Sequence, residues 1–259
     1  IDLVIELLDA RIPLASRNPD IDQLAQNKAR MIILNKADLA EDKWNAAWEE
    51  YFRDKGYEVV RINSRNAGKM KSVHSVIQAA CKEKIERDRK RGILNRPVRA
   101  MVVGIPNVGK STFINSLAGK ACAKTGNKPG VTKGKQWIRL NKQVELLDTP
   151  GILWPKFEDQ SVGQKLAFIG SIKDEIVNTE DLAAELIRFM NSAYKGVLEE
   201  KYQIEGAEDP YQLLEGIARS RNCLLKGQEL DTGKAALLLL DDFRNGKLGR
   251  LTLEYPPEV

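Results

Sequence analysis

The chain has very little of the residues from which many catalytic and metal sites are built. Its 259 residues include one histidine, His74, and three cysteines, which lie far apart at Cys81, Cys122 and Cys223. A single histidine excludes a catalytic triad and a metal site built on histidines, and three separated cysteines favour reduced thiols over a disulfide framework or a zinc site. A surface position on a helix is the simplest interpretation of His74.

Long apolar runs and targeting segments are also absent. No stretch approaches the roughly 18 apolar residues of a membrane span, and no signal or transit peptide is visible. An apolar content of 42% and a charged content of 30% are typical of soluble globular proteins. Because the chain opens inside an expected strand, we expect that the native N-terminus is missing. A cytoplasmic location is expected, and a mitochondrial homologue stays open.

Acidic residues are missing from one long stretch of the chain. Residues 120–142 hold seven Lys or Arg and no Asp or Glu, and residues 82–99 hold eight basic and three acidic residues. The net charge of +5 divides into +11 over residues 1–172 and −6 beyond them. The basic stretch 120–142 favours contact with nucleic acid, whereas 82–99 fits a solvated face equally well. No membrane partner is expected.

One motif decides the expected fold class. Residues 104–112 read GIPNVGKST and match the phosphate-binding loop G-x-x-x-x-G-K-[ST]. Residues 99–103 predict a buried strand and residues 111–118 a helix, which is the context that the motif requires. The helix N-terminus favours anions, the Lys110 ammonium can reach the β- and γ-phosphates, and the Ser111 hydroxyl can bind Mg²⁺. The nucleotide-binding residues expected from this loop are Pro106, Asn107, Val108, Gly109, Lys110, Ser111 and Thr112.

Strands and helices alternate through the first part, which predicts an α/β fold with a mostly parallel sheet covered on both faces. The expected strands are 3–8, 30–35, 57–62, 99–104, 136–140 and 143–147, and the expected helices between them are 20–28, 41–55 and 68–90. After Pro155 only helices are expected, beginning near 161, at Asn178 or Thr179, at Asp209 and at Asp231. We therefore predict a nucleotide-binding domain over 1–172 and an all-α domain over 173–259.

A second phosphate-site sequence, DTPG at 148–151, follows the strand 143–147. Asp148 at the strand end can hold Mg²⁺ through a water, and the Gly151 N–H can contact a γ-phosphate. Thr132 lies between the two motifs, where its hydroxyl can add to the Mg²⁺ ligands. Taken alone, DTPG fits an ordinary turn equally well, and its pairing with the upstream loop is what favours a nucleotide site.

The sequence NKAD at 35–38 suits a guanine base. The Asp38 carboxylate can accept hydrogen bonds from the N1–H and 2-amino groups of guanine, a donor pair that adenine lacks. Asn35 can brace the loop and the Lys36 stem can lie along the ring. After the strand 57–62, a backbone N–H of Ser64-Arg65-Asn66 can meet the guanine O6. Together with the phosphate motifs, this sequence favours GTP or GDP over ATP.

The base-recognition sequences precede the phosphate-binding loop, the reverse of their order in most GTPases. Joining the old termini and opening the chain elsewhere gives this order without disturbing a sheet. With Asp9-Ala10-Arg11, GIPNVGKST and DTPGI, the chain resembles the circularly permuted GTPases, and its helical half most resembles the ribosome biogenesis GTPase A family. The resemblance spans the chain and is strongest over 1–155. It implies a permuted GTPase domain, an RNA-contacting helical domain, and binding to maturing large ribosomal subunits and their rRNA.

The expected reaction is Mg²⁺-dependent transfer of the γ-phosphoryl group to water, with Lys110, Asn107, Thr132 and Gly151 as catalytic residues. Many GTPases carry a glutamine after D-x-x-G that orients the water. Ile152 stands there and cannot hydrogen-bond, so we expect slow intrinsic hydrolysis. The resemblance implies that Asn107 binds an activating K⁺, and that a histidine ahead of the first strand, outside this sequence, takes part in catalysis.

The sequence therefore predicts a monomeric GTPase that assists late assembly of the large ribosomal subunit. Two alternatives stay open. One is a GTPase that signals to a protein partner through its helical domain, and it would have no affinity for ribosomal particles. The other is a GTP sensor with negligible hydrolysis, whose turnover no partner would raise.

Overall fold

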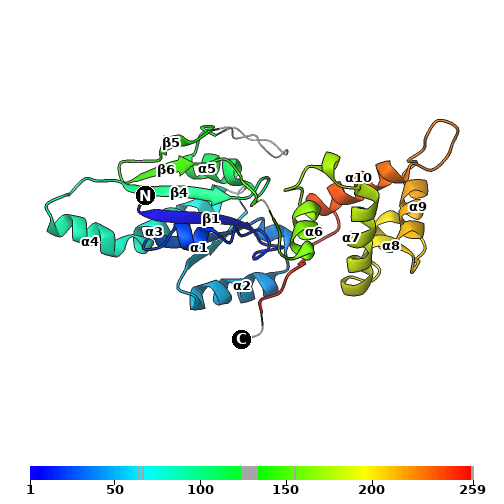
Figure 1. Ribbon diagram of the computed structural model, residues 1–259, viewed down its shortest axis with the longest axis horizontal. Coiled ribbons are helices and arrows are strands. Elements are labelled where there is room, and N and C mark those ends of the chain that lie inside the picture. Colours follow the sequence, from blue (N-terminus) through cyan, green and yellow to red (C-terminus); the bar gives the residue numbers. More distant parts are fainter. Residues whose placement is uncertain (64, 66, 124–133, 155, 258–259) are drawn as a thin grey trace. The chain divides into compact units, whose positions relative to one another are not determined.

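The computed structural model describes residues 1–63, 65, 67–123, 134–154 and 156–257 (Figure 1). These residues form two compact units, one of Ile1–Glu158 with Thr252–Val259 and the other of Asp159–Leu251. The division lies earlier in the chain than the predicted boundary at residue 172. The reason is α6 (Gln160–Phe168), whose buried residues Leu166, Ala167 and Phe168 pack with the helices that follow.

A six-stranded sheet with the order β3-β2-β1-β4-β6-β5 forms the centre of the first unit. Its neighbouring strands pair in parallel, except for the antiparallel pair β5 and β6. The strands are β1 (Leu3–Asp9), β2 (Ala29–Asn35), β3 (Glu58–Arg61), β4 (Val98–Gly104), β5 (Gln136–Arg139) and β6 (Val144–Asp148). The mostly parallel sheet predicted from the sequence is confirmed, and its central strand β1 is buried throughout because helices cover both faces.

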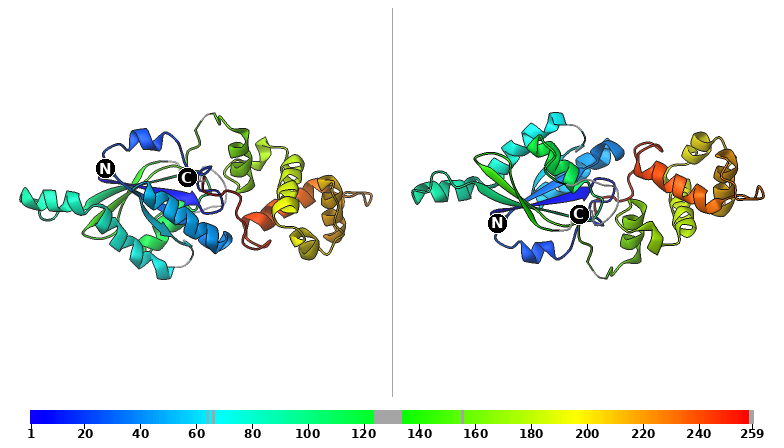
Figure 2. Two further views of the ribbon diagram at one scale, coloured as in Figure 1. Left: turned by 90° about the horizontal axis from the view of Figure 1, so that it is seen from below. Right: turned by 90° about the horizontal axis from the view of Figure 1, so that it is seen from above.

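Helices lie on both faces of the sheet because the crossover connections reverse direction. From β1 to β3 each new strand is added on one side, through α1 (Ile21–Leu24) and α2 (Asp42–Asp54). The chain then returns to β4 through α3 (Met70–Ala80) and continues into α5 (Lys110–Ala118). Right-handed crossovers in opposite directions place their helices on opposite faces, and Figure 2 shows α1 across the sheet from α3 and α5.

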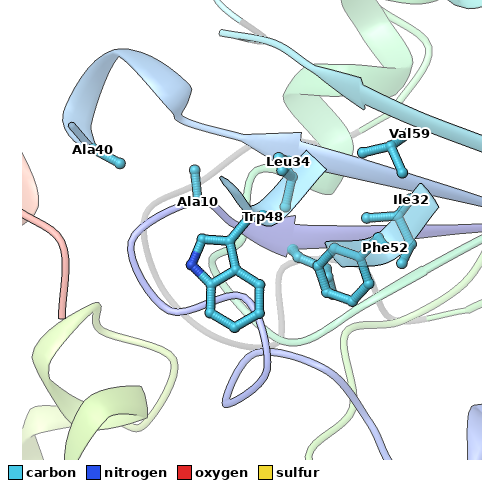
Figure 3. Close-up of a cluster of buried hydrophobic side chains, with 8 residues drawn as sticks. Ala10, Ile32, Leu34, Ala40, Trp48, Phe52 and Val59 are labelled. Atoms are coloured by element: carbon cyan, nitrogen blue, oxygen red, sulfur yellow. The ribbon is translucent and has the colours of Figure 1, made fainter. Parts of the chain in front are cut away.

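The apolar cluster between α2 and the sheet shows why this helix covers one particular face. Ile32 and Leu34 project from β2 toward Trp48 and Phe52 of α2 (Figure 3). Leu8 of β1 belongs to the same cluster, and all five side chains are buried. The two rings stack with their centroids 5.7 Å apart. Apolar residues two apart on a strand share a face, so this cluster fixes which side of the sheet α2 covers.

The single helix predicted over 68–90 is wrong, because the structure has two helices, α3 and α4 (Lys82–Lys90), that meet at Cys81. Val73, Ile77 and Cys81 are buried, so α3 follows the sheet. No residue of α4 is buried, so apolar packing does not hold this second helix to the same surface. The helix predicted over 20–28 is also shorter, since α1 ends at Leu24.

The second unit is all helical, as the sequence predicts. Its helices are α6, α7 (Thr179–Ala193), α8 (Val197–Tyr202), α9 (Pro210–Ser220) and α10 (Thr232–Arg244). Asn178, Asp209 and Asp231 cap α7, α9 and α10 by accepting backbone N–H groups of the first turn. The short α8 has no counterpart in the sequence prediction. Across the residues described, none of the helices combines the length and apolarity that a membrane crossing needs.

The last residues of the chain return to the first unit. The Glu254 carboxylate accepts the backbone N–H of Leu14 at 2.6 Å and of Ala15 at 3.2 Å. Its backbone carbonyl accepts the indole N–H of Trp48 at 3.0 Å, and the Leu253 N–H donates to the carbonyl of Arg11 at 3.1 Å. This segment therefore fixes both the loop after β1 and helix α2.

Candidate nucleotide-binding site

The sequence motifs meet at one edge of the sheet. Asp9 pairs with Asn35 at the ends of β1 and β2, Leu7 pairs with Gly104 at the end of β4, and Val102 pairs with Asp148 at the end of β6. The four strands are neighbours in the order β2-β1-β4-β6 and run in parallel. Their carboxyl ends lie at the point where the crossovers reverse direction, which is where open α/β sheets bind ligands.

The phosphate-binding loop has the backbone shape that its glycines permit. β4 ends at Gly104 and α5 begins at Lys110, with Gly109 at a φ of 96°. A Cβ on Gly109 would collide with the Asn35 amide, and a Cβ on Gly104 would lie 2.9 Å from the Val108 side chain. Only glycine fits both positions. The loop therefore delivers the chain into the N-terminus of α5, where helical N–H groups and the helix dipole favour anions.

Lys110 contacts Asp148 across the loop. Its ammonium Nζ lies 2.5 Å from the Asp148 Oδ1, and the two side chains are only 6% and 1% exposed. Because both charged groups are buried, the attraction between them offsets the free-energy cost of removing each from water. Asp148 and the first turn of α5, which holds Ser111, are thereby brought to one place.

The DTPG segment rests on the backbone of the phosphate-binding loop. A Cβ on Gly151 would lie 3.0 Å from both the N and Cα atoms of Pro106, so the two loops touch. The Thr149 hydroxyl donates to the Val102 carbonyl at 2.8 Å and ties the segment to β4. Ile152, next in the chain, is 61% exposed and offers no hydrogen-bonding atom on its side chain.

The NKAD segment is bonded to the phosphate-binding loop. The Asn35 amide donates to the Val108 carbonyl at 2.9 Å, and the Lys36 ammonium donates to the Asn107 carbonyl at 2.8 Å. Asn107 has a φ of 61°, a left-handed conformation that asparagine tolerates better than most residues. These two bonds join the expected base-recognition loop to the expected phosphate loop.

Other candidate residues lie near the same edge or outside the described residues. Asp38 lies in a short 3₁₀ turn, Ala37–Leu39, directly after the bonded pair, and its side chain is exposed. The Ala37 N–H donates to the Ile62 carbonyl at 3.1 Å, which holds this turn beside the segment that leads to Arg65. Arg65 is exposed. Ser64, Asn66 and Thr132 fall outside the described residues.

Sequence reasoning missed the role of Asp9 and Arg11. The Arg11 guanidinium pairs with the Asp9 carboxylate through two bonds of 2.9 and 2.8 Å, and both side chains are buried. The Lys36 ammonium lies 3.5 Å from the same carboxylate. Burial alone raises the pKa of Asp9, but the charges of Arg11 and Lys36 outweigh it and lower the pKa to about 2. Asp9 therefore positions Lys36 against the phosphate-binding loop.

We expect Asp9→Asn to lower the free energy of unfolding by about 3–5 kcal/mol at pH 7, because it leaves a buried guanidinium without its counter-charge. The unaltered protein has a pKa near 2 for this group, below the ordinary value of 3.8. The ionised carboxylate therefore contributes to the free energy of unfolding above pH 4, and about 2 kcal/mol of this contribution is lost as the pH falls toward 2. Urea unfolding across pH measures both effects. Asp22→Asn, at a carboxylate that is 55% exposed, is the control; equal losses in the two variants would contradict this account.

Comparisons with known proteins agree with this geometry. Residues 99–213 match the family described as 50S ribosome-binding GTPase. Ribosome biogenesis GTPase A of Bacillus cereus is 49% identical over 259 residues, which cover 100% of this chain and 88% of that protein. The protein of the same name from Thermotoga maritima is 32% identical, with the same coverage of each.

Two solved structures are also similar over nearly the whole chain. GNP-bound YlqF from T. maritima has a TM-score of 0.69 and 29% sequence identity, over 100% of this chain and 94% of that chain. The GDP-bound structure of YlqF has a TM-score of 0.69 and 28% identity, over 99% and 96%. The fold, the meeting of the motifs at one sheet edge and the identity over the full chain agree: the chain belongs to the ribosome biogenesis GTPase A family.

Proposed function

We propose that this protein binds and hydrolyses GTP and that it acts in the late assembly of the large ribosomal subunit. One observation carries the nucleotide part of the proposal. Asn35 and Lys36 donate hydrogen bonds to the carbonyls of Val108 and Asn107, which joins the expected guanine loop to the expected phosphate loop and supports a single nucleotide site. Membership of the ribosome biogenesis GTPase A family supports the proposed role in ribosome assembly.

The nucleotide lies, in this proposal, along the carboxyl edge of β2, β1, β4 and β6. Asp38 accepts hydrogen bonds from the guanine N1–H and 2-amino groups, and the turn at Ser64 and Arg65 meets the O6 atom. The N–H groups of the phosphate-binding loop and the Lys110 ammonium hold the phosphates. The proposed contacts are Asn35, Lys36, Asp38, Ser64, Arg65, Pro106, Asn107, Val108, Gly109, Lys110, Ser111, Thr112 and Gly151.

The donors at this edge fit Mg²⁺. Asp148 ends β6 and lies against Lys110, the residue next to Ser111, so this carboxylate and a residue with a hydroxyl group come from the two motifs expected to hold the β- and γ-phosphates. Hard oxygen donors of this kind, few in number, are typical of Mg²⁺ held jointly with phosphates. We propose Ser111, Asp148 and Thr132 as its residues. The ion would neutralise charge on the phosphates, and Asp148 would exchange its contact with Lys110 for it.

Hydrolysis in this proposal depends on positioning and charge. Lys110 stabilises the negative charge of the transferred group, and the Gly151 N–H lies on the loop where the γ-phosphate ends. The water-orienting glutamine of many GTPases has no counterpart in Ile152, whose side chain is apolar and exposed. We therefore propose a low intrinsic rate that a cation and a bound ribosomal particle raise.

Replacing Na⁺ by K⁺ should raise GTP turnover about tenfold, the effect of about 1.4 kcal/mol of added transition-state stabilisation. Asn107 is the proposed K⁺ ligand, because the resemblance implies a K⁺-binding asparagine at this position of the phosphate-binding loop. Steady-state phosphate release in matched chloride salts measures the effect. Asn107→Gly keeps the left-handed backbone and removes the side chain, so it should respond equally to both salts. Equal rates for the unaltered protein in Na⁺ and K⁺ would remove this role.

The proposed partners are the large-subunit precursor and its rRNA, met by a monomer in the cytoplasm. In the helical unit, five exposed cations are candidates for RNA contacts: Arg219, Arg221, Lys226, Lys247 and Arg250. Co-sedimentation with purified large subunits tests the proposal. Binding that is stronger with a non-hydrolysable GTP analogue than with GDP is the expected result, and no binding with either nucleotide would refute the ribosomal part.

The apolar side chain of Ile152 favours one second candidate function, a GTP sensor with negligible hydrolysis. An apolar side chain at this position cannot orient water, whereas nucleotide binding does not depend on it. A sensor would show the same affinity for GTP, but its turnover would stay at the basal level in K⁺ and with large subunits.

A further inference from the structure

Helix α4 contributes nothing to the core of the first unit. It extends beyond the sheet in every view, at the left end of Figures 1 and 2. None of its residues is buried, and residues 89–96 are exposed without interruption. A helix that buries no apolar face is not kept in place by packing, so its side chains are available to something outside the unit.

The charges of α4 divide into an anchored base and a free end. Lys84 lies 3.3 Å from a carboxylate oxygen of Asp2 and 3.1 Å from one of Asp88, and Arg96 lies 3.6 Å from Asp2. The Lys84 pair joins the base of the helix to Asp2, next to the start of β1, and the Arg96 pair joins the segment after the helix to the same carboxylate. The opposite, free end holds four further cations, which we call the basic tip: Arg87, Arg89, Lys90 and Arg91.

The four cations of the basic tip are exposed, and within the described part of the chain no carboxylate lies within ion-pairing distance of any of them. Asp88, the one acidic residue among them, is 13% exposed and is engaged by Lys84. Four cations between residues 87 and 91 therefore outnumber the one carboxylate among them, which Lys84 already engages. Such a cluster creates a local field that attracts anions.

The end of the helix fixes the positions of these cations. Gly92 has a φ of 79° and terminates α4. The Ile93 N–H donates to the Asp88 carbonyl at 2.9 Å and the Gly92 N–H to the Arg89 carbonyl at 3.0 Å, which is the Schellman pattern of helix ends. The turn that carries the basic tip is thus closed by two hydrogen bonds. Its side chains project from a defined backbone.

Two simpler explanations account for only part of this concentration of cations. A cation in the last turn stabilises the helix dipole, but the effect is a fraction of a kcal/mol and does not call for four cations. A solvated helix face commonly mixes both signs of charge, as Glu83 and Glu86 do nearer the base.

We propose that the basic tip is a docking surface for the phosphate backbone of ribosomal RNA, an inference that rests on the proposed ribosomal function. Three of its four cations are arginines, whose planar guanidinium groups bind phosphate oxygens through two parallel hydrogen bonds. Phosphate contacts position a protein on a nucleic acid without reading its sequence. The basic tip therefore orients the nucleotide-binding unit on the particle.

The test compares two variants that lose the same charge. In the tip variant the four cations become glutamine, Arg87→Gln/Arg89→Gln/Lys90→Gln/Arg91→Gln. In the control variant four exposed lysines elsewhere in the same unit become glutamine: Lys28, Lys43, Lys55 and Lys71. Affinity is measured over a range of salt concentrations, for purified large-subunit particles and for protein-free rRNA extracted from them. Affinity for fluorescent GDP reports whether each variant is folded.

We expect the tip variant to bind both particles and protein-free rRNA about 10- to 100-fold more weakly at low salt. The slope of log K against log salt should fall by about one for each phosphate group that the variant no longer neutralises, and so by about 2–4. The control variant should keep the slope of the unaltered chain, and both variants should bind GDP normally.

Three results would overturn the inference. Equal slopes for the tip and control variants would show that the basic tip makes no phosphate contact. A loss seen with particles but not with protein-free rRNA would assign the basic tip to an acidic protein surface, with Ile93 and Leu94 as its apolar contacts. No binding of the unaltered chain to particles would refute the proposed ribosomal function, and the inference with it.

Discussion

Lys110→Ala should reduce the affinity for GTP by about 30- to 4,000-fold, to below detection in calorimetry. Truncating one partner of a buried, charged contact costs about 2–5 kcal/mol, and every 1.4 kcal/mol is tenfold in affinity. Lys110 is the first residue of α5 and its side chain is only 6% exposed. A cation on the protein surface therefore cannot replace its ammonium group at this buried position. GDP, which lacks the γ-phosphate, should lose less affinity than GTP.

Lys110→Ala should also destabilise the fold, and the experiment must distinguish this loss of stability from the loss of GTP affinity. Removing the ammonium leaves the Asp148 carboxylate, 1% exposed, without the charge that lies 2.5 Å away. That loss alone destabilises the fold by about 3–5 kcal/mol. Lys110→Ala/Asp148→Asn removes both charges and should recover most of the stability while GTP binding stays absent. Unchanged GTP affinity in folded Lys110→Ala protein would refute the assignment of the phosphate site.

Asp38→Asn should change the preferred base from guanine to xanthine. The carboxylate accepts two hydrogen bonds from guanine, whereas an asparagine amide presents one acceptor and one donor, which suit the N1–H and the 2-oxo group of xanthine. Sites built to hydrogen-bond a ligand group reject the mismatched analogue by about 10⁴-fold or more when they are fully buried. Asp38 is exposed in the structure, so we expect a smaller change of about 10²–10³-fold.

Competition between GTP and XTP for a fluorescent nucleotide measures this preference directly. Asp42→Asn is the matched control, because Asp42 begins α2 four residues later and its side chain is 71% exposed. It should leave the preference for GTP unchanged. An Asp38→Asn protein that still prefers GTP as strongly as the unaltered chain would show that another residue selects the base.

Much of the fold could be predicted because its signals are local. The parallel strands are rich in apolar residues, and three of the predicted helix starts carry side chains, Asn178, Asp209 and Asp231, that accept backbone N–H groups of the first turn. The meeting of the motifs at one edge also follows from sequence. Residues that end neighbouring parallel strands lie side by side, as Asp9 and Asn35 do.

The features that were not predicted depend on contacts between distant residues. Nothing near Glu254 in the sequence indicates that its carboxylate accepts the N–H groups of Leu14 and Ala15. The break at Cys81 lacks a glycine or proline signal, and it reflects the end of the apolar face that Val73 and Ile77 supply to α3. The buried ion pair of Asp9 and Arg11 could not be predicted, because burial of a compensated ion pair leaves no trace in hydropathy.

GTP turnover in potassium buffer, with and without purified large ribosomal subunits, tests the central claim most directly. We predict that the subunits raise the rate at least tenfold over the low intrinsic rate, and that Lys110→Ala abolishes turnover in both conditions. If the unaltered chain turns over GTP at the same rate with and without the subunits, the proposed switch in ribosome assembly is contradicted.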